Sequence, residues 1–341
     1  MESQGRTKAG DLPLPLGSPL RVPVFAWRAW AISWRSQAEF LRLVRRSERA
    51  YEAEWKGTTR ASHVVIAGAA RVAGLSDANQ CLNSRVGELA RTLVSTRPRG
   101  PVAVLDVGAG AGATTLAVWG ALADEDRSRV QWVLLDPAKT ALANAGAALL
   151  RAGAARDRFQ LVGRKDLDAL PGWKGRFDLI VGSAAVHHHA YLLPVFQGLA
   201  RALKPRGFLI LGDWFNGLSL HPGNILALLK QIEWPTKETD LAAFVRKFPA
   251  SAERRPRASD RRDRAADAQI GRFWLAYVSM KKTAGAGFLL LEGHRRVRHY
   301  VAEIRKAGLH VPRRLPGGWD ENPCFIRPDS SLLGVLLAIK P

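Results

Sequence analysis

A glycine-rich turn between an apolar stretch and a helical pattern constrains this sequence more than any other feature. Val102 to Leu105 are uniformly apolar, as expected of a buried strand, and Asp106 ends that run. Three glycines follow at every second position, namely Gly108, Gly110 and Gly112. Glycine permits a positive φ and a close approach of the backbone to a ligand, and the start of the helix that opens at Thr114 favours an anionic or polar group. The turn therefore predicts a loop that binds a nucleotide-type cofactor.

Two cofactors fit such a loop. Gly108, Gly110 and Ala113 satisfy the dinucleotide pattern G-x-G-x-x-G/A, with Asp136 as the ribose ligand. Asp106, however, occupies a position where dinucleotide folds usually carry an apolar residue. The pattern D-x-G-x-G-x-G resembles the class I methyltransferases, which bind S-adenosylmethionine. This resemblance implies that Asp106 organises the contacts to the methionine moiety and that Asp136 holds the ribose hydroxyls.

The order of the downstream elements agrees with this resemblance. Four further apolar stretches predict strands, at Val130–Leu135, Phe159–Val162, Phe177–Val181 and Phe208–Leu211. The stretch Leu203-Lys-Pro-Arg-Gly207 is similar to the family's turn into its fifth strand. We expect a helix over 138–152, a last helix over 292–306 that ends at Gly308, and a final strand pair near His310 and at 332–339. The implied fold is α/β: a Rossmann-like sheet of seven mostly parallel strands with helices on both faces, plus an N-terminal helical extension.

The resemblance also implies which residues contact the cofactor. Asp166, followed by Leu170-Pro171, resembles the family's loop whose acid faces the adenine. The whole expected set is Asp106, Gly108, Ala109, Gly110, Gly112, Asp136, Pro137, Asp166, Leu167 and Ser183.

Candidate catalytic residues follow from the chemistry of methyl transfer. Transfer from a sulfonium needs mainly alignment, and a base only where the acceptor keeps its proton at neutral pH. His187 and His188 follow the fourth strand at the edge where open α/β sheets bind ligands, and His188 is slightly preferred. In similar enzymes this histidine is frequently structural. His294 lies in a segment that resembles the last helix of quinone-type methyltransferases, and Asp213 either binds a substrate hydroxyl or caps a turn.

No metal site is expected. The consecutive histidines from His187 to His189 cannot all face one point, and Cys81 and Cys324 are the only cysteines.

The acceptor is expected to be a small, partly apolar molecule with a hydroxyl or an activated carbon, such as a quinone-like compound. Gly182-Ser-Ala-Ala-Val186 lacks the D/N/S-P-P-Y/F motif that grips a flipped base, and Pro323-Cys324 lies too far along the chain to match the carbon-5 pyrimidine enzymes. The net charge of +21 keeps nucleic acid and a peripheral membrane contact open as partners, beside a merely basic solvated surface. The alternatives are an RNA or protein methyltransferase and a non-catalytic regulator that binds the cofactor or nucleic acid.

The chain is expected to divide into five parts. These are a disordered lead (1–20), a helical region that forms a lid or packs on the core (21–98), the cofactor core (99–215), an acceptor-covering insertion (216–290) with a basic loop at 246–264, and the last helix with the final strand pair (291–341). No apolar stretch is long enough to span a bilayer and no secretory signal is visible, so a cytoplasmic location is expected.

Overall fold

The computed structural model describes residues 68, 70–71, 74–163, 172–189, 192–215, 269, 296–317, 321–327 and 330–341. Several expectations lie outside the described residues. They concern the lead at 1–20, most of the helical region before residue 74, the insertion at 216–290 with its basic loop, and the site residues Asp166, Leu167 and His294.

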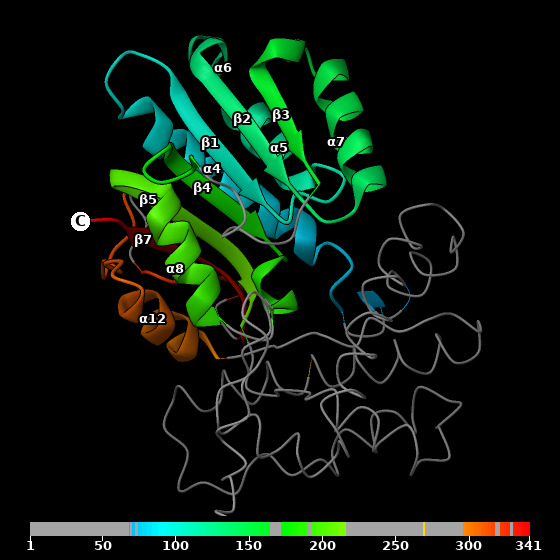
Figure 1. Cartoon of the computed structure of the whole chain (residues 1–341). Coiled ribbons are helices and arrows are strands. Elements are labelled where there is room, and N and C mark those ends of the chain that lie inside the picture. The colour runs from blue at the N-terminus through cyan, green and yellow to red at the C-terminus, as the bar shows by residue number, and fades with distance from the viewer. Residues whose placement is uncertain are drawn as a thin grey trace, which may run out of the picture.

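A seven-stranded sheet forms the centre of the molecule, in the order β3-β2-β1-β4-β5-β7-β6 (Figure 1). Its strands are β1 (Val102–Val107), β2 (Val130–Leu135), β3 (Phe159–Val162), β4 (Phe177–Ser183), β5 (Leu203–Trp214), β6 (Cys324–Arg327) and β7 (Ser330–Ile339). Neighbouring strands from β3 to β5 pair in parallel, whereas β7 pairs antiparallel with both β5 and β6. The strand order reverses between β1 and β4, and this switch point is where open α/β sheets bind ligands. The predicted fold class is confirmed.

Two strand boundaries, the end of β1 and the start of β5, differ from the sequence-based expectation. Asp106 lies inside β1, opposite Leu134 of β2, rather than at its end. The stretch from Leu203 is already part of β5, because Leu203 pairs with Phe177 before the register shifts. The next paired residues are Leu179 and Phe208, and Arg206, within the irregular stretch of β5, has a positive φ of 58°.

The final strand pair also differs from the expectation. The partner of β7 is β6, which begins at Cys324, and His310 forms only an isolated bridge with Ile339. The N–H of His310 donates to Ile339 at 2.8 Å, and that of Ile339 donates back at 2.7 Å. One reciprocal pair of hydrogen bonds makes a bridge but no strand.

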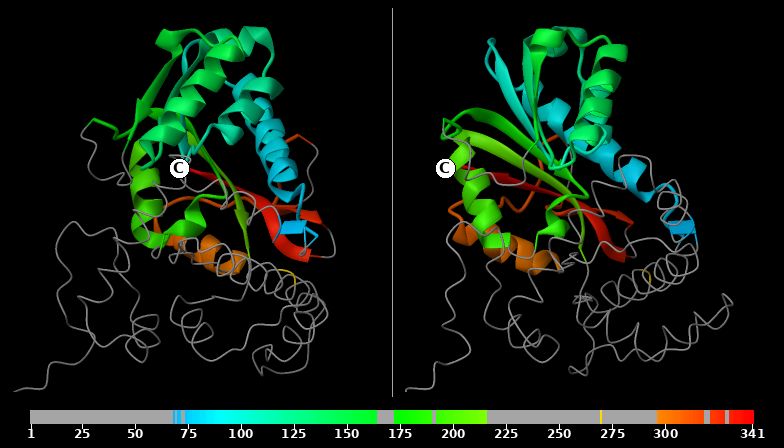
Figure 2. Two further views of the ribbon diagram at one scale, coloured as in Figure 1. Left: turned by 90° about the vertical axis from the view of Figure 1, so that its right-hand side faces the viewer. Right: turned by 45° about the vertical axis from the view of Figure 1, so that its right-hand side comes forward.

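Helices cover both faces of the sheet (Figures 1 and 2). The described helices are α4 (Ala78–Ser95), α5 (Ala113–Ala121), α6 (Asp124–Arg129), α7 (Lys139–Arg151), α8 (Leu192–Ala202) and α12 (Val297–Lys306), with short 3-10 turns η1 (Arg156–Arg158) and η2 (Val186–His188). Buried side chains of α4, α5 and α7 share one apolar cluster, and those of α8 and α12 share the other. The sheet is therefore the middle of three layers.

The last helix is shorter than expected. Arg296 has an extended backbone and is the N-cap, so α12 begins at Val297. Gly308 follows its last turn with a φ of 84°, which confirms the predicted end of this helix.

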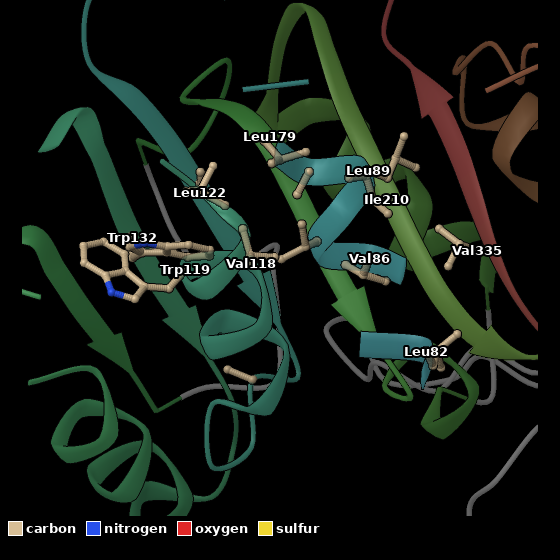
Figure 3. Packing of buried hydrophobic residues seen from close by; sticks show 14 of the residues in the cluster. Leu82, Val86, Leu89, Val118, Trp119, Leu122, Trp132, Leu179, Ile210 and Val335 are labelled. Atoms are coloured by element: carbon tan, nitrogen blue, oxygen red, sulfur yellow. The ribbon is translucent and has the colours of Figure 1, made fainter. Parts of the chain in front are cut away.

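Close contact between α4 and the sheet fixes the end of β5. Leu82, Val86 and Leu89 face Ile210 and Val335 in Figure 3. A Cβ added at Gly212 of β5 would lie 2.8 Å from a methyl group of Val86. The absence of a side chain at this glycine therefore lets α4 pack directly against β5.

Candidate functional site

The three loop glycines all have positive φ, at 70°, 51° and 87° for Gly108, Gly110 and Gly112. This confirms the conformation expected of the turn. The reason for glycine differs in part from the expectation. A Cβ at Gly108 would lie 2.4 Å from that of Ala185, and a Cβ at Gly112 would lie 3.0 Å from that of Ala145. Two of the glycines are thus required by the protein's own packing, whether or not a ligand approaches.

Most backbone donors of the loop bond within the protein. The N–H groups of Gly108 and Ala109 donate to the carbonyl of Leu135 at 2.8 and 3.1 Å. The N–H of Gly110 donates to Asp136 Oδ2 at 3.0 Å, and the N–H of Ala138 donates to Asp136 Oδ1 at 2.8 Å. The Asp136 side chain thus joins the end of β2 to the loop. A carboxylate oxygen has two lone pairs, so each Asp136 oxygen can accept more than one hydrogen bond. Pro137 beside it is exposed.

Asp106 is fully buried beneath the loop. The hydroxyl of Thr115, from the first turns of α5, donates to Asp106 Oδ2 at 2.5 Å. Burial raises the pKa of the Asp106 carboxyl from 3.8 to about 7, the Thr115 bond opposes that rise, and the charge of Asp136 adds to it. The carboxyl is therefore balanced near neutral pH, where a cationic group beside it would favour the ionised form.

Two buried polar atoms lack hydrogen-bond partners among the described residues at this edge of the sheet. They are Asp106 Oδ1 in β1 and Ser183 Oγ at the end of β4. The two strands are neighbours at the switch point, with Asp106 opposite Val181. Buried polar atoms are almost always hydrogen-bonded, so an orphaned pair indicates a site for a polar ligand. Ala184, directly after Ser183, has a φ of 51°, a strained conformation of the kind that gathers at functional sites.

A second group of polar side chains joins the ends of β4 and β5. His187, in η2, and Asp213, in β5, are both buried. The distance between His187 Nδ1 and Asp213 Oδ1 is 2.6 Å, and the N–H of His187 donates to Asp213 Oδ2 at 3.1 Å. The N–H of Trp214 donates to Oδ1 at 2.8 Å. A carboxylate that receives two backbone donors is an acceptor, so the imidazole nitrogen that faces it is the donor.

The structure thus joins two of the four candidate catalytic residues. His188 follows His187 within η2, and nothing is described of its side chain. His294 lies outside the described residues. Within the described part of the chain, no three His, Cys, Asp or Glu side chains converge as a metal site, and no helix has both the length and the apolar character to cross a membrane.

Sequence patterns did not single out several residues that support the site. Tyr300 of α12 donates its hydroxyl to Asp213 Oδ2 at 3.3 Å. On α4, the Asn79 side chain accepts from Trp214 Nε1 at 3.1 Å, and the Asn83 side chain accepts from the Thr114 hydroxyl at 3.2 Å. Tyr300 and Ile304 form the buried stripe of an amphipathic helix, so spacing alone predicts a core role for Tyr300.

Comparison with known proteins shows that part of the chain matches a protein family. Residues 105–209 match a family model described as a methyltransferase domain. No curated protein sequence matches the chain.

Solved structures of low sequence identity are also similar to the chain. The mitomycin 7-O-methyltransferase MmcR is 16% identical, with 74% of this chain and 53% of that chain covered and a TM-score of 0.40. The DszA carbon methyltransferase is 16% identical, with 72% and 49% covered and a TM-score of 0.44. A complex of the Haloferax volcanii Trm112 methyltransferase activator with a methyltransferase gives 16% identity, 81% and 97% coverage and a TM-score of 0.40. The chain spans about half the length of the first two.

Proposed function

Because residues 105–209 match a methyltransferase-domain model, we propose that the chain transfers a methyl group from S-adenosylmethionine to a small, partly apolar acceptor. The methylated atom is a hydroxyl oxygen or an activated carbon, as in a quinone-like compound. The observation that carries the proposal is the buried Asp106 oxygen without a partner among the described residues, beside the glycine loop at the switch point.

The residues at this edge fit the cofactor. When bound, S-adenosylmethionine supplies a methyl group on a positively charged sulfur. Asp106 Oδ1 is a buried acceptor suited to the ammonium group of the methionine moiety, whose charge would stabilise the ionised carboxyl. Asp136 would accept from the ribose hydroxyls, and Ser183 offers a further hydroxyl. Gly108 to Gly112 and Pro137 would line the same edge, and the family resemblance adds Asp166 and Leu167, which lie outside the described residues, to the expected cofactor contacts.

The His187–Asp213 pair supports an acceptor that must lose a proton. With Nδ1–H donated to Asp213, the neutral imidazole of His187 has its lone pair on Nε2, the form that can accept a proton. Asp213 also stabilises the imidazolium that forms. We therefore prefer His187 as the base, in place of the sequence-based preference for His188. A hydroxyl or an enolisable carbon needs this assistance, whereas a simple amine does not.

One group of described basic side chains lies at the edge of the sheet opposite Asp106 and His187, where a bound nucleic acid would be far from the proposed chemistry. This group comprises Arg97, Lys174, Arg176, Lys204, Arg206 and Lys340. Burial and the nearby Lys174 charge lower the pKa of Lys340. Asp178, the buried acid among them, pairs with Lys204 at 2.7 Å. A polyanion bound at this edge would lie across the sheet from Asp106 and His187.

Calorimetric titration with S-adenosylhomocysteine, with NADH in parallel, tests the cofactor. We expect micromolar binding of S-adenosylhomocysteine alone. Asp106→Asn should abolish this binding, whereas Asp178→Asn, which changes a buried acid at the opposite end of β4, should leave it intact. Binding of NADH instead would identify an oxidoreductase, and absence of both would favour the non-catalytic regulator.

Transfer of a labelled methyl group to a panel of phenols, quinols and RNA then tests the acceptor. Incorporation into a phenol or quinol alone is the expected result. Incorporation into RNA alone would overturn the small-molecule acceptor.

A further inference from the structure

We propose that Tyr300 is a positioning residue of the active site. Its hydroxyl holds the Asp213 carboxylate in the orientation in which that carboxylate holds His187. The catalytic meaning of this inference rests on the proposed function, but the contacts that carry it do not. It makes α12, an element far along the chain from the cofactor loop, part of the proton-transfer apparatus.

The ring of Tyr300 has a fixed position. Its side chain is fully buried. The ring meets that of Phe215 edge to face at 4.9 Å and 83°, and that of Phe196 on α8 lies 6.2 Å away. Such ring pairs hold aromatic side chains in specific orientations. The hydroxyl is therefore carried on a rigid support, and a phenylalanine at this position would keep the same ring contacts.

The Tyr300 hydroxyl donates to the Asp213 carboxylate, whose two oxygens have different hydrogen-bond partners. Oδ1 faces His187 Nδ1 at 2.6 Å and accepts from the N–H of Trp214. Oδ2 accepts from the N–H of His187 at 3.1 Å and from the Tyr300 hydroxyl at 3.3 Å. Rotation of the carboxylate about its Cβ–Cγ bond would break contacts at both oxygens. The His187 N–H reaches Oδ2 from η2 and the Tyr300 hydroxyl reaches it from α12, so Tyr300 adds a restraint from a second element against this rotation.

Tyr300→Phe removes one of two described donors to Oδ2 and leaves the backbone donor in place. The His187–Asp213 contact should therefore persist with looser geometry, and the effect should be smaller than that of Asp213→Asn. Ile304→Val is the matched control, because Ile304 is the other fully buried residue of α12 and its side chain is apolar. It perturbs the packing of the helix and leaves the hydroxyl in place.

Proton NMR of the ligand-free protein, labelled with 15N at histidine, tests the inference without the cofactor. The Nδ1–H of His187 should give a resonance far downfield of the amides, because short hydrogen bonds to carboxylates deshield the proton. The resonance should vanish in His187→Gln and Asp213→Asn and remain unchanged in Ile304→Val. In Tyr300→Phe it should move upfield and exchange faster with water. A Tyr300→Phe spectrum like that of the wild type, or no such resonance in the wild type, would overturn the inference.

Kinetics supply the second readout. In Tyr300→Phe, kcat for a hydroxyl acceptor should fall about three- to tenfold, the equivalent of one hydrogen bond, while the KM of the cofactor stays within about twofold. Equal losses in Ile304→Val would assign the effect to packing and overturn the inference. A wild-type protein that fails to bind S-adenosylhomocysteine would overturn the proposed function instead, and the NMR result would stand independently.

Discussion

Lowering the pH from 7 to 5 should weaken the binding of S-adenosylhomocysteine about fiftyfold, because Asp106 must be ionised to accept from the ammonium group of the ligand. With a pKa of about 7, about half of the Asp106 carboxyl is ionised at pH 7 and about one hundredth at pH 5. The apparent affinity falls with the ionised fraction. Below the pKa, binding must also release about one proton per site.

The same carboxyl should make the ligand-free protein less stable as the pH rises. Its folded pKa of about 7 exceeds the value of 3.8 expected for the unfolded chain, so the folded state binds this proton more tightly. Stability is therefore greatest below pH 3.8 as far as this group is concerned, and falls until the pH passes about 7. The rise from 3.8 to about 7 corresponds to about 4 kcal/mol.

Calorimetry from pH 5 to 8, in buffers of different ionisation enthalpy, measures both the affinity and the released proton. Urea unfolding over the same range measures the stability. Asp106→Asn supplies the control for the unfolding measurement, since it should lack the part of the stability loss between pH 5 and 7 that Asp106 causes. Binding that is equally strong at pH 5 and 7, with no proton released, would refute the assignment of Asp106 to the ammonium group.

Other substitutions test separate parts of the structure. Gly108→Ala would place a side chain on a residue with a φ of 70°, with its Cβ 2.4 Å from that of Ala185. Urea unfolding should show that the free energy of unfolding falls by about 2 to 4 kcal/mol. A variant as stable as the wild type would contradict the packing described for the loop. Gly212→Ala would place a Cβ 2.8 Å from a methyl group of Val86, and this overpacking should lower the free energy of unfolding by about 1 to 3 kcal/mol. A second substitution in the same chain, Val86→Ala, should partly restore the stability. His187→Gln should lower the rate of methyl transfer to a hydroxyl acceptor about 10²- to 10⁴-fold, while S-adenosylhomocysteine binds as in the wild type. A variant as active as the wild type would show that His187 is not the base.

The sheet was predictable because its strands are buried on both faces. A mostly apolar stretch such as Val130–Leu135, flanked by charged or glycine-rich segments, has few structures open to it other than a buried strand. Boundaries that depend on tertiary pairing were not predictable in the same way. Leu203 belongs to β5 because Phe177 lies opposite, and no local pattern carries that information.

The site residues that lie close to one another in the sequence were predictable. Asp106 and the glycines follow one another along one strand–loop–helix unit, and Asp136 follows the next strand, β2, which pairs in parallel with β1. The pairing of His187 with Asp213 needs the parallel contact of β4 and β5. Tyr300 lies 87 residues from Asp213 on an amphipathic stripe, where a tyrosine and a phenylalanine satisfy the same pattern. Long-range polar contacts of this kind are visible only in three dimensions.

The course of the chain around the sheet has a practical consequence. Asn79 contacts Trp214 at the end of β5, so the chain enters α4 at the same edge at which it leaves β5. Tyr300 brings the start of α12 to that edge too. The C-terminus lies at the opposite edge, where Lys340 bonds to Leu203, at the start of β5 (Figure 1). The described chain is therefore entered before α4, and interrupted between β5 and α12, at the edge of the sheet that carries Asp213. A label attached near Lys340 would therefore lie at the edge of the sheet opposite Asp213 and Tyr300.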